Sequence, residues 1–371
     1  MLWGERLDRP TYSFLHTLDE GNTAVCRRGF HEIFQQDVVQ KTVSMLGFES
    51  AVTNEPALLK RVEHDHIVKV WEAQWDPKLT ELRAITFVSP YYKGGSIYTA
   101  LSGGYEFGVH QVMQIADHTL NALDAMHKTH GIVHRDVKPA NIMLSENRTV
   151  GYLGDLGSAA HIDPSTGCVS SEMGSPLYQA PEARPGGFVT PRADLYALGV
   201  TVVEMLNGPF PYDRLDACQI DQRLTLGRRA LPDSYYTPSP WVPKQLASWV
   251  KSLCHCNPDK RPADAATALR ALRNLRVVDW RRLEGEKLEG RWHGYWPPQS
   301  LRPDQRIYEI RTEAITKGIH KGKLAASARW RLSNGKWRNY AKLKTQIEAS
   351  NASLGRFFRS VESNAQAAPT R

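Results

Sequence analysis

The sequence lacks any run of apolar residues long enough to cross a lipid bilayer, which takes about 20 residues in a helix. The longest apolar stretch, residues 195–206, is interrupted by Thr201 and Glu204. The first ten residues also lack the apolar core of a secretory signal peptide. We therefore expect a soluble, cytoplasmic protein that makes no membrane contact.

Cysteine is scarce and unevenly spaced. The five cysteines, an odd number, lie at positions 26, 168, 218, 254 and 256, so they do not form the paired framework of a disulfide-rich secreted protein. The pair in Cys254-His-Cys256 has no second ligand pair of suitable spacing after it, which favours ordinary thiols over a metal site. This cysteine usage indicates a reducing compartment.

Enough apolar residues are present for a folded protein. A chain of 371 residues, 41% hydrophobic and 23% charged, can form two or three cores. The net positive charge comes from the C-terminal part of the chain. Residues 276–371 contain 20 Lys or Arg against 9 Asp or Glu, whereas residues 1–275 carry a small net negative charge.

One polar cluster lies between two apolar segments of residues 131–144. The octapeptide His134-Arg-Asp-Val-Lys-Pro-Ala-Asn141 places a carboxylate, an ammonium group and a carboxamide within six positions. Phosphoryl transfer needs such a set: a carboxylate to accept a hydroxyl proton, a cation beside the moving phosphoryl group, and an oxygen ligand for a hard divalent metal. Taken alone, the octapeptide would favour an ordinary surface loop that carries Asp, Lys and Asn.

The octapeptide resembles the catalytic loop of the eukaryotic-type serine/threonine protein kinases, H-R-D-x-x-x-x-N, in which a Lys follows two residues after the Asp. The resemblance implies that Asp136 orients the acceptor hydroxyl, that Lys138 neutralises charge on the transferred group and that Asn141 binds Mg²⁺. It also makes Arg135 available to pair with a phosphate on the activation segment.

The N-terminal residues 11–47 alternate as a strand-rich segment, and its first turn occupies the place of the glycine-rich loop that covers the nucleotide phosphates in this family. Only Gly21 of the three family glycines is present. Asp19 and Ala24 replace the other two, so the backbone is expected to approach the phosphates less closely.

The register after this turn follows the family pattern. Fifteen residues separate Cys26 from Lys41, and the run Val38-Val-Gln-Lys41 resembles the strand whose lysine contacts the α- and β-phosphates. The resemblance places Cys26 and Val39 over the adenine ring.

The expected partner of this lysine is Glu55. Apolar residues at 58, 59 and 62 have the helical period of a packed regulatory helix, and Pro56 suits a helix that begins there. The spacing makes Glu55 the match, with Glu63 on a solvated face.

The segment 89–96 resembles the hinge between the two kinase lobes. Pro90 has no N–H group, so a donor to the adenine must come from a later residue such as Tyr92. Ser89 stands at the position that gates the pocket behind the adenine. The residues expected around ATP are Leu18, Gly21, Cys26, Val39, Lys41, Ser89, Tyr91, Tyr92 and Met143.

A second loop, Gly154-Asp-Leu-Gly157, stands where the family has D-F-G. The resemblance makes Asp155 the second metal ligand and Gly157 the glycine of this motif. It implies that Leu156 is an apolar residue packed under the regulatory helix. The activation segment runs over residues 155–182 and ends like the family's G-T-x-x-Y-x-A-P-E.

Ser175 replaces the family's Thr, and we expect its hydroxyl to bond Asp136 and Lys138. Ser171 is the first candidate for phosphorylation, followed by Ser170 and Thr166. The alternative is an unmodified loop.

Two further marks imply structural roles. Asp194 is expected to accept hydrogen bonds from backbone N–H groups of the catalytic loop. Arg261 is expected to form a buried ion pair with Glu182.

Together the marks predict an α+β, bilobal protein kinase fold over residues 11–275, with an N-lobe (11–89) and a C-lobe (93–275). The expected function is transfer of the ATP γ-phosphate, with Mg²⁺, to Ser or Thr of protein substrates, including autophosphorylation on the activation segment. A pseudokinase scaffold is the main alternative. A small-molecule kinase is opposed by Lys138 and the peptide-binding end of the activation segment.

The remaining segments resemble no known family. Helical periodicity at 304–317 and 336–348, separated by a turn at 333–335, predicts a mostly helical, basic accessory domain. The expected divisions are an N-terminal arm (1–10), an aromatic and proline-containing linker (276–303), the accessory domain (304–363) and a disordered tail (364–371).

Cations interleaved with Trp330, Trp337, Tyr340, Phe357 and Phe358 suit a nucleic-acid-binding module, and equally an acidic protein partner. The third interpretation of residues 304–363, which we favour, is a helical cap with aromatics in its core and a solvated basic face.

Overall fold

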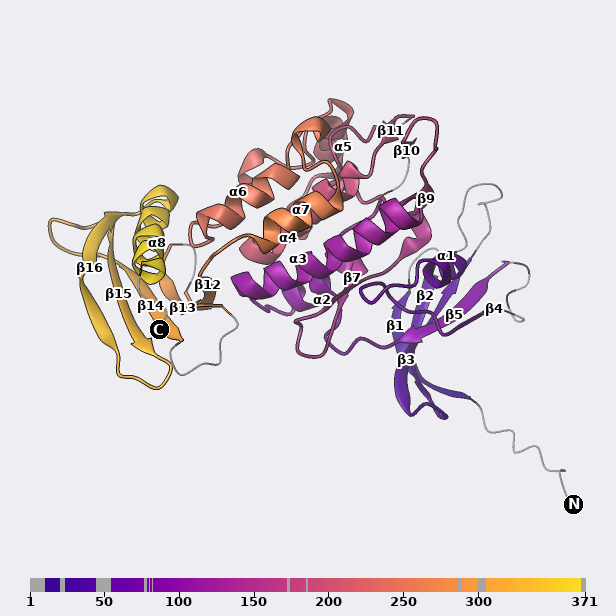
Figure 1. Ribbon diagram of the computed structural model, residues 1–371, viewed down its shortest axis with the longest axis horizontal. Helices are drawn as coiled ribbons and strands as arrows, with labels where there is room; N and C mark the ends of the chain where they lie inside the picture. The colour runs from indigo at the N-terminus through magenta and orange to yellow at the C-terminus, as the bar shows by residue number, and fades with distance from the viewer. Residues whose placement is uncertain are drawn as a thin grey trace, which may run out of the picture.

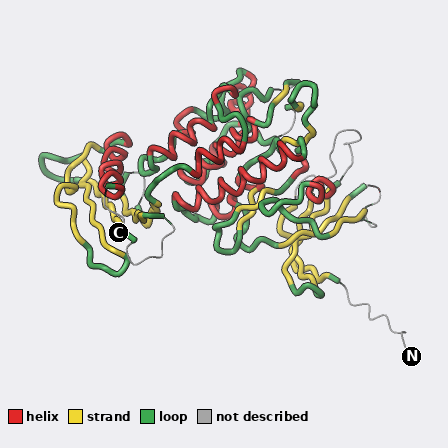
Figure 2. The backbone as a smooth tube through the Cα atoms, in the orientation of Figure 1, coloured by secondary structure: helices red, strands yellow, loops and turns green. Residues whose placement is uncertain are grey.

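The computed structural model describes residues 11–20, 24–44, 55–76, 79, 81, 83–171, 174–184, 186–285, 288–298 and 305–367. The chain passes from a strand-rich lobe through a helical lobe to a second strand-rich unit (Figure 1). Helices are concentrated in the middle of the molecule, between the two sheets (Figure 2). The expected N-terminal arm (1–10) and Gly21 lie outside these residues. None of the described helices has the length and apolarity required to span a membrane.

The N-lobe consists of a sheet and one short helix. Among its described residues, five antiparallel strands pair in the order β1-β2-β3-β5-β4. The helix α1 begins at Glu55 with Pro56 second, as the proline predicts. The elements are β1 (Tyr12–Glu20), β2 (Ala24–His31), β3 (Gln36–Val43), α1 (Glu55–Arg61), β4 (Glu72–Trp75) and β5 (Ile85–Pro90).

The C-lobe is built around two long helices. In α4, every residue from Ala193 to Leu206 is buried, which explains why its sequence is apolar all round. The amphipathic α3 packs against it and leads into the catalytic loop. The helices are α2 (Ile97–Ser102), α3 (Val109–Asp124), α4 (Arg192–Asn207), α5 (Ala217–Thr225), α6 (Lys244–Leu253) and α7 (Ala265–Arg273).

Three short antiparallel pairs hold the loops of the C-lobe. In the described residues β6 pairs with β9, β7 with β8, and β10 with β11. The strands are β6 (Ile132–Val133), β7 (Ile142–Leu144), β8 (Gly151–Leu153), β9 (Ala160–His161), β10 (Val169–Ser170) and β11 (Phe188–Val189).

The C-terminal region corrects the prediction of a mostly helical domain after a linker. Its described residues form a five-stranded antiparallel meander, followed by one helix. The predicted linker contributes the first two strands. The elements are β12 (Asp279–Glu284), β13 (Gly290–Trp296), β14 (Arg306–Ala314), β15 (Lys323–Leu332), β16 (Arg338–Glu348) and α8 (Asn351–Gln366).

The burial of β14 explains the wrong period. Residues 307–310 are all buried, so the alternation typical of a strand appears only at its C-terminal end, where exposed Arg311 precedes buried Thr312. The expected turn at 333–335 is confirmed, because the Gly335 N–H donates to the Leu332 carbonyl at 2.9 Å.

Aromatic rings fill the core between this sheet and α8. The Phe358 ring meets Trp280 edge-on at 5.0 Å and Trp292 at 5.4 Å between centroids. The Trp280 Nε1–H donates to the Glu362 carboxylate at 2.8 Å. Burial raises the pKa of Glu362 to about 7, although the hydrogen bond from Trp280 opposes the shift.

The accessory domain (276–367 as described) is attached to the C-lobe beside α3. The His110 N–H, in the first turn of α3, donates to Asp279 Oδ1 at 2.8 Å. The helix begins after Gly108, which has no capping side chain, so Asp279 acts as a cap from another domain. At the other end, Gln366 Nε2 donates to the Arg276 carbonyl at 2.9 Å. Helix α8 reaches Gln366, which corrects the tail predicted from residue 364.

Candidate active site

The lysine of β3 lies between two carboxylates. Lys41 Nζ is 2.9 and 3.0 Å from the two Glu55 oxygens and 3.1 Å from Asp155 Oδ1. Burial disfavours the charge on Lys41, but Glu55 and Asp155 outweigh this effect and raise its pKa. Glu55 is 7% exposed, and burial raises its pKa against the attraction of Lys41. A strand and a helix of the N-lobe and a loop of the C-lobe therefore meet at this ammonium group.

The loop that carries Asp155 has a special backbone. Asp155 adopts a left-handed conformation with φ of 59°, which is uncommon for a residue other than glycine. The Leu156 side chain is fully buried, and its N–H bonds the Glu55 carboxylate. A Cβ atom at Gly157 would lie 3.3 Å from Asp155 Oδ1, so glycine leaves room for the carboxylate.

Asp136 is held from three sides. Its Oδ2 accepts from Lys138 Nζ at 2.8 Å and from Asn141 Nδ2 at 3.0 Å, and its Oδ1 accepts from the Ser175 N–H at 2.9 Å. Lys138 Nζ also donates to Ser175 Oγ at 2.7 Å. The expected contact of the Ser175 hydroxyl with Lys138 is present, whereas Asp136 binds the backbone of Ser175.

The shape of the catalytic loop is fixed by α4. The N–H groups of His134 and Arg135 donate to the two carboxylate oxygens of Asp194 at 2.8 and 2.9 Å, as expected. His127 Nε2 adds a contact at 2.8 Å to the same carboxylate, and these hydrogen bonds lower the pKa of Asp194 against the effect of its burial. His127 was missed, because a single histidine near the end of a helix has no distinguishing sequence pattern.

The two expected metal ligands lie in adjoining loops. The Gly154 N–H donates to the Asn141 carbonyl at 2.9 Å, and His134 Nε2 lies 3.0 Å from the Gly154 carbonyl. Burial opposes the charge of Asp155, but Lys41 lowers its pKa below the ordinary value, so the carboxylate is ionised. Because Asn141 donates its Nδ2 to Asp136, its side-chain oxygen is left as an acceptor. Two hard oxygen donors of this kind fit Mg²⁺.

The walls of the nucleotide site come from neighbouring strands. Cys26 pairs with Lys41 across β2 and β3, and Val39 pairs with Ser89 across β3 and β5. On the opposite lobe, Met143 lies on β7 and pairs with Tyr152 of β8.

The hinge has one donor already in use. The Tyr91 N–H donates to the Asp37 carbonyl at 3.0 Å. Because this N–H group is already bound, Tyr92 remains the expected donor to the adenine. Leu18, on β1, is 42% exposed. The side chains of Asp19 and Ala24 fall outside the described part.

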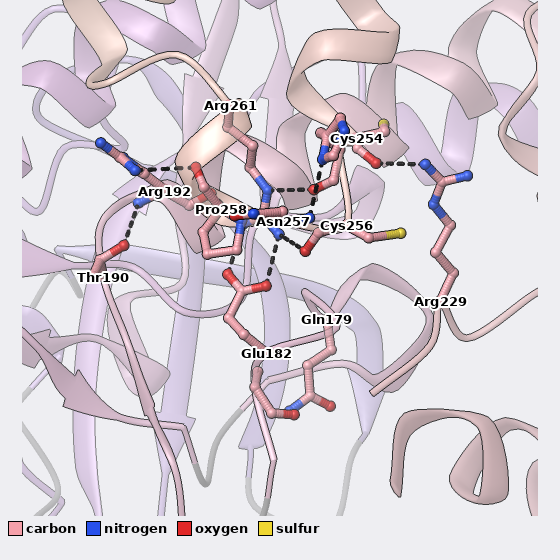
Figure 3. A network of polar contacts seen from close by, with 12 residues as sticks. Gln179, Glu182, Thr190, Arg192, Arg229, Cys254, Cys256, Asn257, Pro258 and Arg261 are labelled. Atoms are coloured by element: carbon pink, nitrogen blue, oxygen red, sulfur yellow. Dashed lines mark hydrogen bonds and ion pairs between the residues drawn. The ribbon is translucent and has the colours of Figure 1, made fainter. Parts of the chain in front are cut away.

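The expected ion pair of Arg261 and Glu182 is present in the C-lobe (Figure 3). The two guanidinium nitrogens lie 2.7 and 2.6 Å from the two carboxylate oxygens. The remaining donors of Arg261 bind backbone carbonyls of Arg192, His255 and Cys256. All five N–H groups of this fully buried side chain thus have acceptors.

The activation segment corrects the choice of Ser171 as first candidate for phosphorylation. Ser171 is 3% exposed, and its hydroxyl donates to the Arg184 carbonyl. In this conformation the hydroxyl is not accessible to the active site of a kinase. Thr166, the third candidate, is exposed. The Arg135 guanidinium donates to the carbonyls of Ser158 and Ser170 at 2.5 and 2.9 Å.

A buried polar network behind the segment was missed. Tyr178 and Tyr212 donate to the two oxygens of Glu204 at 2.7 and 2.5 Å. Burial raises the pKa of Glu204. The one sequence signal was a glutamate inside the otherwise apolar α4.

The aromatic residues of the accessory domain do not form an open stacking platform. Phe357 and Phe358 are buried under the sheet. Trp330 and Trp337 each contact two guanidinium groups, whose carbons lie 4.6 to 5.3 Å from the ring centroids. Base stacking, which supported the nucleic-acid interpretation, is therefore not favoured.

Comparison with known proteins agrees with this geometry. The chain is 30% identical over 210 residues to a probable serine/threonine-protein kinase of Dictyostelium discoideum, a match that covers 56% of this chain and 22% of that protein. It is 27% identical over 226 residues to serine/threonine-protein kinase SIK1 of Mus musculus, covering 60% and 28%. It is 26% identical over 265 residues to CBL-interacting protein kinase 25 of Oryza sativa subsp. japonica, covering 67% and 48%.

The chain thus spans less than half the length of each of these relatives. Residues 12–272 match the protein kinase domain family as a whole. With the fold, the lysine between two carboxylates and the constrained aspartate in place, the chain belongs to the protein kinase family.

Proposed function

We propose that the chain is a serine/threonine protein kinase that uses ATP and Mg²⁺ to phosphorylate protein substrates in the cytoplasm. The observation that carries the proposal is the position of Asp136, held by Lys138, Asn141 and the Ser175 N–H. The five cysteines are all free, which supports a reducing compartment.

Asp136 is placed to receive a proton. Its carboxylate orients the acceptor hydroxyl and takes its proton as the oxygen attacks. Lys138 bonds both Asp136 and Ser175. It neutralises charge beside the reacting oxygen and connects Asp136 to the peptide-binding end of the activation segment. This tie supports a Ser or Thr acceptor in a protein.

Lys41 is placed to hold phosphates. Glu55 fixes the direction of its Nζ from within the N-lobe, and Asn141 and Asp155 would hold the metal. Bound Mg²⁺–ATP supplies the γ-phosphoryl group and neutralises its charge. Because Lys41 Nζ lies 3.1 Å from Asp155 Oδ1, this ammonium group would bind the phosphates beside the aspartate that would hold the metal.

Autophosphorylation on the activation segment is part of the proposal. Thr166 is exposed and lies in a turn between β9 and β10. We expect phosphate there, detectable by peptide mapping after incubation with ATP and Mg²⁺.

The test is transfer of labelled phosphate to a generic basic protein by the purified chain. Asp136→Asn should reduce the rate by roughly 10²–10⁴-fold while nucleotide binding persists, and Lys41→Met should abolish transfer. Glu63→Gln, on an exposed position of the same lobe, is the control. Wild-type protein that binds ATP without transferring phosphate would instead establish the pseudokinase alternative.

A further inference from the structure

The accessory sheet has one covered and one open face. Cross-strand neighbours Trp292, Ile310 and Ala328 form a row on the face packed against α8. The adjacent row, His293, Glu309 and Arg329, points to the opposite side. We call this opposite side the open face.

A buried carboxylate organises the cations of the open face. Glu309 is 2% exposed, and its Oε1 accepts from Arg311 Nε at 2.6 Å and from Arg329 Nε at 2.7 Å. His293 Nε2 lies 3.1 Å from the other oxygen. Because both arginines bind the same oxygen, their guanidinium groups are held side by side.

Trp337 fixes a third arginine in the same cluster. The indole ring lies 4.6 Å from the guanidinium carbon of Arg329 and 5.1 Å from that of Arg331. Arg331 Nη1 donates to the Ser333 carbonyl at 2.7 Å, while its buried Nε has no hydrogen-bond partner within the described ranges. Stacking and hydrogen bonds thus restrain all three side chains before any ligand arrives.

The cluster retains unused binding capacity. Glu309 takes only the Nε–H of Arg311 and of Arg329, and no acceptor for their terminal nitrogens occurs in the part of the chain that the structure describes. The two side chains are 44% and 32% exposed. Within the cluster, three guanidinium groups face one carboxylate and leave a net positive charge. Glu284 and Glu313 also lie near Arg311 and help to raise its pKa.

A hollow adjoins the cluster across β14, β15 and β16. Its volume is about 590 Å³, and its walls include Arg311, Ser327 and Lys344. These three residues form one cross-strand row, with the small Ser327 between the two cations. Two residues further along β15 on the same face, Ala325 continues the shallow floor between Glu313 and Gln346. An extended chain fits such a trough better than a folded surface does.

We propose that the open face binds an extended peptide that carries a phosphate monoester. The phosphate accepts hydrogen bonds from the terminal nitrogens of Arg311, Arg329 and Arg331, whose planar forks match its oxygens. The peptide backbone lies in the hollow, beside Lys344. Nucleic acid is disfavoured because the rings that would stack on bases are already covered by arginine. Phosphopeptide binding stands independently of the catalytic proposal, although it would let the chain retain products of that reaction.

The test is fluorescence anisotropy with the full chain and no ATP. The probe is a labelled nine-residue peptide of Gly, Ser and Glu with one central phosphoserine, compared with the same peptide unphosphorylated. We expect the phosphate to strengthen binding about tenfold or more, because hydrogen bonds between guanidinium groups and a charged phosphate are stronger than those between neutral groups. Raising the salt concentration should weaken the complex.

The variants separate this face from general positive charge. Arg311→Gln and, independently, Lys344→Gln should each weaken phosphopeptide binding several-fold. Arg356→Gln, on α8 at the covered side of the sheet, and Lys251→Gln, on α6 of the C-lobe, are at exposed positions. They lose the same charge and should bind as wild type. The Lys344→Gln variant keeps the test valid if removal of Arg311 disturbs the fold.

Four results would overturn the proposal. The first is equal affinity for the phosphorylated and unphosphorylated peptides, and the second is equal weakening by the control variants and by Arg311→Gln. The third is a higher affinity for a ten-nucleotide single-stranded RNA than for the phosphopeptide, and the fourth is displacement of the labelled phosphopeptide by free inorganic phosphate at the same concentration as by unlabelled phosphopeptide. The third would assign the face to nucleic acid. The fourth would reduce it to a simple anion site.

Discussion

Both large regions of the molecule contain an arginine held by a carboxylate, but the two arrangements differ in what they leave open. In the kinase domain, Arg261 is fully buried and every donor is bound by protein. In the accessory domain, Glu309 is equally buried, yet Arg311 remains 44% exposed and gives Glu309 only its Nε–H. The saturated pair can only support structure, whereas the unsaturated pair still has hydrogen bonds to offer.

The largest expected effect is a difference in unfolding free energy between variants of the two arginines. Arg261→Ala removes a fully buried guanidinium group, so that Glu182, 21% exposed, and the three backbone carbonyls that Arg261 binds lose their partner. This change should cost about 3–5 kcal/mol of unfolding free energy. Arg311→Ala should cost less than about 1 kcal/mol, because Arg311 is 44% exposed and Glu309 keeps Arg329 and His293 as partners. Urea unfolding of the two variants measures both values, and equal losses would remove the distinction between the two arginines.

A second prediction concerns a carboxylate on the covered side of the accessory sheet. Glu362 has a pKa near 7 in the folded protein, raised by burial from 4.5, so the folded state binds a proton that the unfolded state releases between these pH values. Its contribution is therefore favourable below pH 4.5 and is lost as the pH rises to 7, a change of about 3 kcal/mol. Thermal unfolding of wild type and Glu362→Gln should diverge over this range, with the Gln variant gaining at pH 8.

The Gln variant is a matched comparison, because its Oε1 still accepts the hydrogen bond from Trp280 and only the titrating proton is removed. A constant difference between the two proteins from pH 4.5 to 8 would contradict the raised pKa.

The smallest expected effect lies where the two regions meet. Asp279→Ala removes the acceptor of the His110 N–H and should cost about 1 kcal/mol, as for other helix caps. Hydrogen exchange at the first turn of α3 should accelerate, while Asp279→Asn, which keeps an acceptor oxygen, should change it little. Unchanged exchange in the Ala variant would show that the domains are stabilised separately.

The kinase domain could be predicted because its motifs follow the order of the protein kinase family, and the resemblance implied which residues meet. It implied the ion pair of Arg261 with Glu182 and the hydrogen bonds of the catalytic loop to Asp194, and the structure contains both. The contact of Lys41 with Glu55 was implied in the same way. Exposure could not be derived in this way, as the burial of Ser171 shows.

The accessory domain was harder, because apolar side chains can pack in many ways. With residues 307–310 all buried, the period-two signal of β14 is blurred. The two tryptophans assigned to a linker, Trp280 and Trp292, are in fact the centre of a core formed by the first two strands and the last helix. That pairing is distant in sequence, and no local pattern records it.

The hydrogen bond between Gln366 and the Arg276 carbonyl brings the entry and exit of the accessory domain to one place. A unit whose ends adjoin can be grafted into a loop of an unrelated carrier protein without stretching either partner, as domain insertions generally require. The five strands and α8 therefore meet the geometric condition for transfer into another protein.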